Sequence, residues 1–271
     1  MLGSIAGDII GSTYEFNNTK DYNFELFPRN SNFTDDSVLT CAVAEAILNS
    51  KEGELPDYRT NIVKFARKYP GRGYGGGFKR WLSSKDTDMP YNSFGNGSAM
   101  RVGPIGFVFD NLFDTQREAK RSAEVSHNHP EGIKGAMAVA TAIYKAKQGS
   151  SKSMIGNYLR LHYDYDVYRK YEDVKKSYYF NETCQETVPE AIIAFLDSGN
   201  YEDAIRKAIS MGGDSDTIGC IVGGIAQAYY KDIPEYIKNT AFTILDRDLQ
   251  KIVSEFSYKY LGEKLNAPQR I

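Results

Sequence analysis

Two short acidic segments contain most of the residues that could do chemistry. FTDDSVLT spans 33–40 and GGDSDTIG spans 212–219, and each lies at the start of an apolar stretch. Together they supply four carboxylates and two hydroxyls, from Thr34, Asp35, Asp36, Asp214, Asp216 and Thr217. One Asp is enough to cap a helix, so capping alone does not explain two in each segment. Because neighbouring carboxylates repel one another, a bound cation is the natural compensation.

The type of ligand indicates which cation would bind. Both segments offer oxygen atoms, and neither contains a His or Cys. An oxygen-only set favours Mg²⁺, with Mn²⁺ or Ca²⁺ as weaker alternatives. A third carboxylate pair, Asp8 and Glu15 in GDIIGSTYE (7–15), is spaced to share one face of a helix. Six carboxylates and two hydroxyls are enough for two metal ions about 3.5–4 Å apart.

The segment YNSFGNGSAMRVGPIGF (91–107) and the later SHNHPEG (126–132) suggest an anionic ligand. The closely spaced amides of 95–98 predict an anion-binding nest. Arg101 is either a phosphate partner or an internal ion-pair anchor for the acidic site. His127 fits a single imidazole that supports a ligand hydroxyl or phosphate. A nest, aromatic rings and a metal site would suit a nucleotide-like ligand that carries phosphates.

The elements that must position these residues are helical. Apolar spacing typical of helices predicts a helix at the N-terminus, where Gly7 and Gly11 would give it a smooth side, and further helices over 37–50, 130–149, 188–200, 201–210 and 217–232. Convincing alternating strands are absent from the pattern, and no linker divides the chain. The tyrosine-rich stretch 162–182 is interpreted as a surface excursion between helices. We therefore expect an all-α, single-domain bundle over 1–271.

Composition narrows the class of protein. The chain has 271 residues, 41% hydrophobic and 25% charged, with a net charge of −2, so neither nucleic acid nor an anionic membrane surface is indicated as a partner. Three widely spaced cysteines, Cys41, Cys184 and Cys220, favour a reducing compartment. The sequence shows no signal-peptide pattern and no apolar run of membrane-spanning length. These features predict a cytoplasmic protein, and nothing in them requires more than a monomer.

The order of the motifs resembles that of a known family. G-D-x-x-G-x-x-x-E, T-D-D, G-N-G-x-A-M-R, S-H and D-x-D-T-I-G follow one another between Gly3 and Tyr230. This order resembles the ADP-ribosylglycohydrolases, which include the dinitrogenase-reductase-activating glycohydrolases and the ADP-ribosyl-acceptor hydrolases. The resemblance implies a compact, orthogonal all-α bundle around a binuclear Mg²⁺ centre.

The resemblance also implies roles for individual residues. The implied metal ligands are Thr34, Asp35, Asp36, Asp214, Asp216 and Thr217. Asp216 is favoured as the shared ligand, and Asp214 is either a ligand or a support for the ligands. Glu15 corresponds to the acidic residue that faces the scissile bond. The ADP-ribose channel would be lined by Gly95, Asn96, Gly97, Ser98, Met100 and the stretch 73–77, including Tyr74 and Gly75. His127 would lie near the diphosphate or the proximal ribose.

The implied reaction is hydrolysis of the bond between C1″ of ADP-ribose and an acceptor. Metal ions would hold the 2″ and 3″ hydroxyls of the distal ribose, and Asp35, Asp36 or Glu15 would act as general base toward the attacking water. Two alternatives remain open: a metal-dependent nucleotide phosphohydrolase and a non-catalytic ADP-ribose-binding protein. The expected partner is an ADP-ribosylated protein or another ADP-ribosyl acceptor. The acceptor is not specified, because segments 16–32 and 162–185, which would decide it, show little pattern.

Overall fold

The computed structural model describes residues 1–51, 53–84 and 86–265, and this part of the chain is helical. The α-helices are α1 (Leu2–Gly11), α2 (Asp35–Asn49), α3 (Tyr58–Lys68), α4 (Gly76–Ser83), α5 (Gly97–Met100), α6 (Gly103–Val108), α7 (Leu112–Glu124), α8 (Pro130–Lys147), α9 (Lys152–Tyr163), α10 (Tyr171–Ser177), α11 (Cys184–Asp197), α12 (Tyr201–Ser210), α13 (Ser215–Tyr230), α14 (Glu235–Ile244) and α15 (Arg247–Phe256). A π-helical turn, η1 (Ser257–Leu261), follows α15. The described residues form no β-strand, only an isolated bridge between Gly95 and Thr183. The all-α prediction is confirmed.

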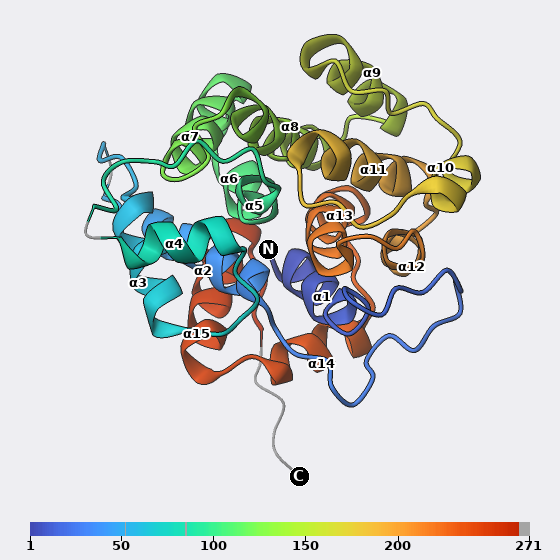
Figure 1. Cartoon of the computed structure of the whole chain (residues 1–271), viewed down its shortest axis with the longest axis horizontal. Coiled ribbons are helices and arrows are strands. Elements are labelled where there is room, and N and C mark those ends of the chain that lie inside the picture. Colours follow the sequence, from blue (N-terminus) through green and yellow to red (C-terminus); the bar gives the residue numbers. More distant parts are fainter. Residues whose placement is uncertain (52, 85, 266–271) are drawn as a thin grey trace.

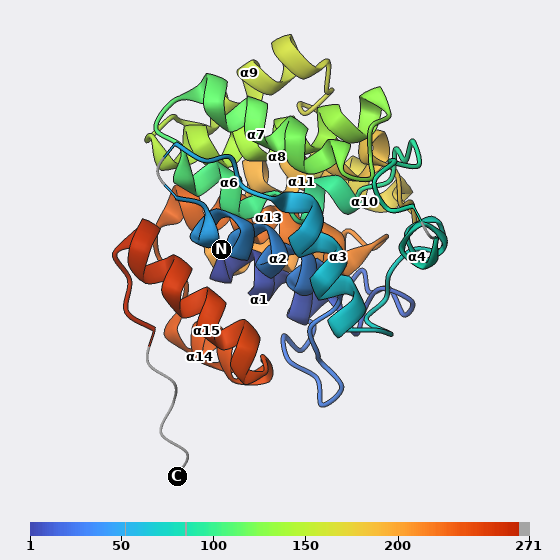
Figure 2. The ribbon, with the colours of Figure 1, turned by 90° about the vertical axis from the view of Figure 1, so that its left-hand side faces the viewer.

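Helices α1 and α13 lie at the centre of the bundle, and the other helices surround them (Figures 1 and 2). Every residue of α1 is buried, as is α13 from Ser215 to Ala228. A helix that is apolar on all sides is stable in water only when other elements cover it. The absence of charge from most of α13 therefore follows from its central position, with α8, α11 and α12 packed against it.

Glycine allows α1 and α13 to approach each other closely. Gly3, Gly7 and Gly11 recur every four residues and so share one face of α1. A Cβ atom added at Gly7 would overlap the carbonyl group of Gly219, and one added at Gly219 would overlap the carbonyl group of Gly7. The smooth side expected from Gly7 and Gly11 is confirmed.

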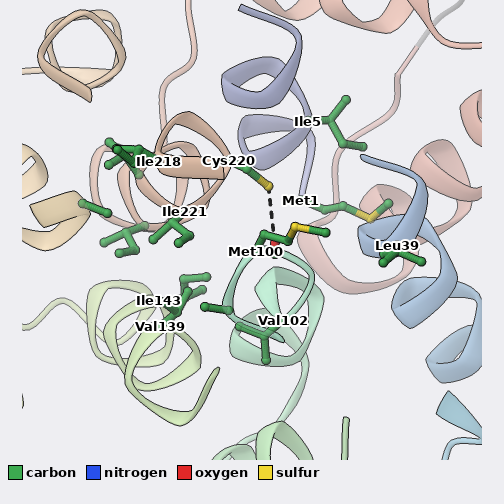
Figure 3. Close-up of a cluster of buried hydrophobic side chains, with 14 of the residues drawn as sticks. Met1, Ile5, Leu39, Met100, Val102, Val139, Ile143, Ile218, Cys220 and Ile221 are labelled. Atoms are coloured by element: carbon green, nitrogen blue, oxygen red, sulfur yellow. Dashed lines mark hydrogen bonds between the residues drawn. The ribbon is translucent and has the colours of Figure 1, made fainter. Parts of the chain in front are cut away.

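The buried hydrophobic side chains of the described residues form one continuous cluster. Figure 3 shows part of it, where Met100, Leu39, Ile5 and Cys220 come together from four different segments, with the Cys220 thiol donating to the Met100 carbonyl oxygen at 3.3 Å. This packing fixes the ends of the helices that carry the acidic residues. One cluster fits the expected single domain, although the last six residues of the predicted range 1–271 lie outside the described part.

Two details of the predicted helices are wrong. The helix expected over 188–200 begins at Cys184, so Pro189 lies inside α11. The first turn before that proline buries Cys184, Thr187 and Val188, and this burial offsets the hydrogen bond that proline cannot donate. The expected helices over 37–50 and 217–232 likewise begin two residues earlier, at Asp35 and Ser215, so their acidic residues belong to the first turns.

The stretch 162–182 is a surface excursion between helices, as expected, and most of its residues are exposed, but one side of it is buried. Tyr163, Tyr165 and Val167 are buried, and Tyr171 and Val174 of α10 join them in the core cluster. The phenol of a tyrosine packs as an apolar body with a polar tip, so a tyrosine-rich segment can cover a core while reading as polar. Among the described residues, no helix combines the length and the apolar character needed to cross a membrane.

Candidate metal and substrate site

Three helix ends bring the acidic residues together. Asp8 lies in the last turn of α1, Asp35 and Asp36 form the first turn of α2, and Asp216 lies in the first turn of α13. Asp214 is the residue that precedes α13. Helix N-termini present unpaired N–H groups and a positive dipole end, which favour carboxylates there. The close contact of α1 with α13 then places Asp8 beside Asp216.

Asp8 is held by the start of α2. Its carboxylate accepts hydrogen bonds from the Thr34 hydroxyl at 2.7 Å and from the backbone N–H groups of Thr34 and Ser37, each at 3.1 Å. The Ser37 hydroxyl also donates to it. Thr34 caps α2 by accepting a hydrogen bond from the Asp36 N–H at 3.2 Å. Thr34 and Ser37 thus orient Asp8 toward the other carboxylates.

The carboxylates form two groups with ligand spacing. Asp8, Asp36 and Asp216 make one group, and Glu15, Asp214 and Asp216 make the other. Within each group the oxygen atoms lie within 4.8 Å of one another. Asp216 belongs to both groups, which is the position that the sequence predicts for a shared ligand. Asp35 lies at the same cavity but belongs to neither group.

Burial and mutual repulsion raise the pKa values of these acids. Burial, followed by the negative charge of Asp216, raises the pKa of Asp8 to about 7. The same two causes raise the pKa of Asp35, Asp36 and Asp214 well above the usual range. Burial, Asp216 and Glu182 raise the pKa of Glu15 to about 8. Close carboxylates that lack a compensating positive charge behave in this way.

The donor atoms fit a hard divalent cation. All of them are carboxylate or hydroxyl oxygens, which Mg²⁺ prefers. One oxygen of Asp36, Oδ1, is buried and has no hydrogen-bond partner among the described residues, and the Thr217 hydroxyl lies 3.4 Å from the other. A buried acceptor without a partner costs free energy that a cation would recover.

The acidic groups open into a cavity of about 780 Å³, which includes the space at its mouth. Of the predicted residues, its lining contains Glu15, Asp35, Asp36, Gly75, Gly95, Asn96, Gly97, Met100, His127, Asp214, Asp216 and Thr217. Residues that were not named individually for the site also line it: Leu39, Phe78, Tyr91, Ser93 and Glu182. Tyr91 and Ser93 belong to the segment 91–107 that suggested an anionic ligand, whereas no pattern distinguished Leu39, Phe78 or Glu182 from ordinary loop and core positions.

Four predicted site residues lie outside this lining, and one of them is Asp8, which is fully buried. Ser98 is fully buried and donates to the Gly132 carbonyl oxygen at 2.7 Å, so its hydroxyl supports α5 from behind. Tyr74 is buried, and its ring stacks on Phe78 at 5.4 Å. The Thr34 hydroxyl donates a hydrogen bond to Asp8, and Thr34 caps the N-terminus of α2.

One geometric expectation for the site is wrong. Glu15 does not share a helix face with Asp8, because α1 ends at Gly11 and the chain turns before Glu15. Of the four amides of 95–98 expected to form an anion-binding nest, two already have acceptors: the Gly95 N–H donates to the Ser93 hydroxyl, and the Asn96 N–H donates to the Glu182 carbonyl oxygen. Asn96 has a different role: its side-chain amide donates to Asp214 Oδ2 at 2.7 Å and so orients that carboxylate.

The raised pKa of Asp8 predicts a pH dependence for the metal-free protein. Asp8 keeps its proton up to about pH 7 in the folded state, whereas the unfolded chain releases it near 3.8. The folded state therefore binds more protons between these values, and the free energy of unfolding falls as pH rises, by about 1.4 kcal/mol per pH unit for one such group. Urea unfolding in the presence of chelator at pH 5 and at pH 8 measures this change in the free energy of unfolding.

The control for that prediction is Asp8→Asn, which should reduce the pH dependence of stability, while the other acids with raised pKa values keep part of it. Adding Mg²⁺ at pH 8 should restore stability by about 2.7 kcal/mol at a concentration one hundred times its Kd. Equal stability of the metal-free protein at both pH values, with no effect of Mg²⁺, would contradict the assignment of a cation site.

The fold and the acidic cavity define the class of protein to which this chain belongs. The model of the ADP-ribosylglycohydrolase family matches residues 1–264, so the chain belongs to that family. It is therefore a hydrolase of the kind that acts on ADP-ribosyl glycosidic bonds.

Individual relatives support this membership. ADP-ribosylhydrolase ARH3 of Homo sapiens is 28% identical over 87% of this chain and 86% of its own length. The Danio rerio protein of the same name is 26% identical over 85% of this chain and 81% of its own. A solved structure described as an ADP-ribosylglycohydrolase-related protein complex has a TM-score of 0.72 and 21% identity, and covers 94% of this chain and 95% of its own. That structure is similar in fold.

Proposed function

We propose that this chain hydrolyses the C1″ glycosidic bond of an ADP-ribosylated acceptor with the help of two Mg²⁺ ions and releases free ADP-ribose. The observation that carries the proposal is the pair of carboxylate groups that share Asp216 at the base of the cavity. When bound, Mg²⁺ supplies positive charge that holds ribose hydroxyls and acidifies a water molecule. Asp8, Asp36 and Asp216 would hold one ion, and Glu15, Asp214 and Asp216 the other, with the Thr217 hydroxyl beside Asp36.

Glu15 is the candidate for proton transfer at the scissile bond. Unlike the four aspartates, which are buried, Glu15 is half-buried in the turn after α1 and lines the cavity. Its pKa is raised to about 8 in the metal-free protein, and a bound cation would lower it, so in the loaded site Glu15 would be the ionised base that accepts a proton from the attacking water. The transition state is expected to resemble an oxocarbenium ion, as in other glycoside cleavage, and the negative charges around it would stabilise that positive charge.

The acceptor would leave the cavity past an aromatic rim. Phe16 is 85% exposed and stacks on Phe180 at 6.0 Å, next to Glu15 and Glu182. Phe16 and Phe180 come from the two segments, 16–32 and 162–185, that were expected to determine the acceptor. A release assay over defined linkages, ADP-ribosyl-serine, ADP-ribosyl-arginine and an ADP-ribose ester, identifies the acceptor that the rim accepts.

Calorimetry with ADP-ribose, together with a turnover assay, tests whether the protein is an enzyme or only a binding protein. We expect ADP-ribose to bind more tightly with Mg²⁺ than without it, and ADP-ribose to be released over many turnovers from at least one linkage. If ADP-ribose binds but none of the linkages is cleaved, the catalytic proposal is contradicted.

A further inference from the structure

Arg101 is a buried cation without a counter-charge. It is fully buried and lines the cavity. Its Nη2 donates to the Ser122 carbonyl oxygen at 2.7 Å and to the Ser126 hydroxyl at 3.1 Å, whereas its Nε and Nη1 have no hydrogen-bond partner among the described residues. The ion pairs of those residues do not include Arg101, so the role of ion-pair anchor is excluded.

Leaving a guanidinium in this state is costly. A buried charge normally has a partner, because removing it from water costs several kcal/mol. Six carboxylates also line the cavity, from Glu15, Asp35, Asp36, Glu182, Asp214 and Asp216, and they would repel a phosphate. Arg101 is the only lysine or arginine among the described residues that line the cavity. An anionic ligand group near Arg101 would provide its missing counter-charge.

Ser126 connects Arg101 to His127. The Ser126 hydroxyl oxygen lies 2.8 Å from His127 Nδ1. Because the guanidinium can only donate, the Ser126 oxygen accepts from Arg101, and its own hydrogen remains free to donate to Nδ1. The opposite arrangement, with Nδ1 donating, would leave the serine hydrogen without a partner among the hydrogen bonds of the described residues. The Ser126 hydroxyl therefore favours the tautomer with hydrogen on Nε2.

His127 presents this second nitrogen to the glycine side of the cavity. A Cβ atom added at Gly97 would lie 3.1 Å from Nε2, and one added at Gly95 would lie 3.6 Å away. Burial, followed by the charge of Arg101, lowers the pKa of His127 well below its usual value, so the ring is neutral at pH 7. A neutral imidazole whose Nε2–H points into a cavity is a hydrogen-bond donor of fixed direction.

We propose that Arg101 and Ser126 are positioning residues that hold His127 as an Nε2–H donor to a phosphate oxygen, with the Arg101 charge behind it attracting the diphosphate of ADP-ribose. This proposal rests on the proposed function and on the expected place of His127 near the diphosphate, and it adds the positioning roles of Arg101 and Ser126. No covalent step is involved. These side chains would allow a carboxylate-rich cavity to bind a doubly anionic ligand.

The test compares two serines one turn apart. Ser126→Ala removes the hydroxyl that contacts His127. Ser122→Ala is the matched control, because Ser122 is also fully buried and contacts Arg101 through its backbone carbonyl, whereas its own hydroxyl has no partner among the described residues. The ¹⁵N shifts of the His127 ring, measured without ligand, report its tautomer. Calorimetry in Mg²⁺ measures affinity for ADP-ribose, pyrophosphate and ribose.

We expect the Nε2–H form in the unmodified protein and in Ser122→Ala, and a mixture of tautomers in Ser126→Ala. Affinity for ADP-ribose and pyrophosphate should fall about tenfold in Ser126→Ala, which corresponds to one hydrogen bond of about 1.4 kcal/mol, with no change for ribose. Arg101→Lys should retain more of the phosphate affinity than Arg101→Met. An Nδ1–H form in the unmodified protein, or equal pyrophosphate affinities in the two serine variants, would overturn the inference.

These measurements separate this inference from the proposed function. The tautomer is read without substrate, and pyrophosphate binding needs no glycosidic bond. If the protein releases ADP-ribose but both serine variants behave alike, the positioning role fails and the function stands. If no linkage is cleaved but the tautomer and pyrophosphate results appear, the function fails and the phosphate-recognition element stands.

Discussion

Asp216→Asn should reduce the Mg²⁺-dependent release of ADP-ribose by about 10³-fold or more, equivalent to about 4 kcal/mol of transition-state stabilisation. Asp216 is the one carboxylate common to both acidic groups, so its loss would remove a ligand from both of the ion sites that we propose. An amide keeps the shape of the side chain but lacks the negative charge that a cation needs. Steady-state rates at saturating Mg²⁺ measure the effect.

The structure predicts a graded series around this variant. Asp36→Asn, which affects one group, should also abolish turnover, but Mg²⁺ should retain part of its effect on stability because the second group is intact. Asp110→Asn is the control, since Asp110 is exposed between α6 and α7, away from the cavity. Unchanged rates in both Asp216→Asn and Asp36→Asn would contradict the two-group arrangement.

Gly7→Ala should destabilise the protein by up to about 2 kcal/mol, despite the higher helix propensity of alanine. The added methyl group would overlap the carbonyl group of Gly219, so α1 and α13 would have to separate. Overpacking of a close helix contact typically costs 1–3 kcal/mol, against a gain of about 1 kcal/mol from replacing glycine within a helix. Urea unfolding in the presence of chelator isolates this effect from metal binding.

The same substitution should also weaken the site. Asp8 follows Gly7 directly, and its distance to Asp216 is set by the contact between the two helices. Mg²⁺ should therefore bind Gly7→Ala less tightly, even at a temperature where the variant is folded. Gly76→Ala is the control, because its methyl group would meet only the Arg80 guanidinium, at 3.6 Å. Equal stability of the two variants would show that α1 and α13 tolerate a wider separation.

Part of this arrangement could be predicted from the sequence, and the reason is physical. Apolar spacing every three to four residues, with charge missing from 217–230, defined the helices and the central position of α13. Paired acids at helix starts identified the candidate metal site, because capping requires only one acid. The glycines every four residues in α1 predicted its close contact with a second helix.

The remaining features depend on contacts between distant segments. Glu182 lines the cavity, but no feature of its own segment distinguishes it from a solvated acid. The link from Arg101 through Ser126 to His127 requires α5 and the end of α7 to meet, which local spacing does not specify. Pro189 was expected near the start of a helix but lies inside α11, because tertiary burial outweighed local propensity.

The most direct test of the account is to identify the product formed from an ADP-ribosylated acceptor with Mg²⁺ and with chelator. In Mg²⁺ we expect free ADP-ribose and an unmodified acceptor, because water attacks C1″ and the diphosphate remains intact. In chelator we expect neither product. Release of AMP or inorganic phosphate, or an equal rate of ADP-ribose release in chelator, would contradict the account.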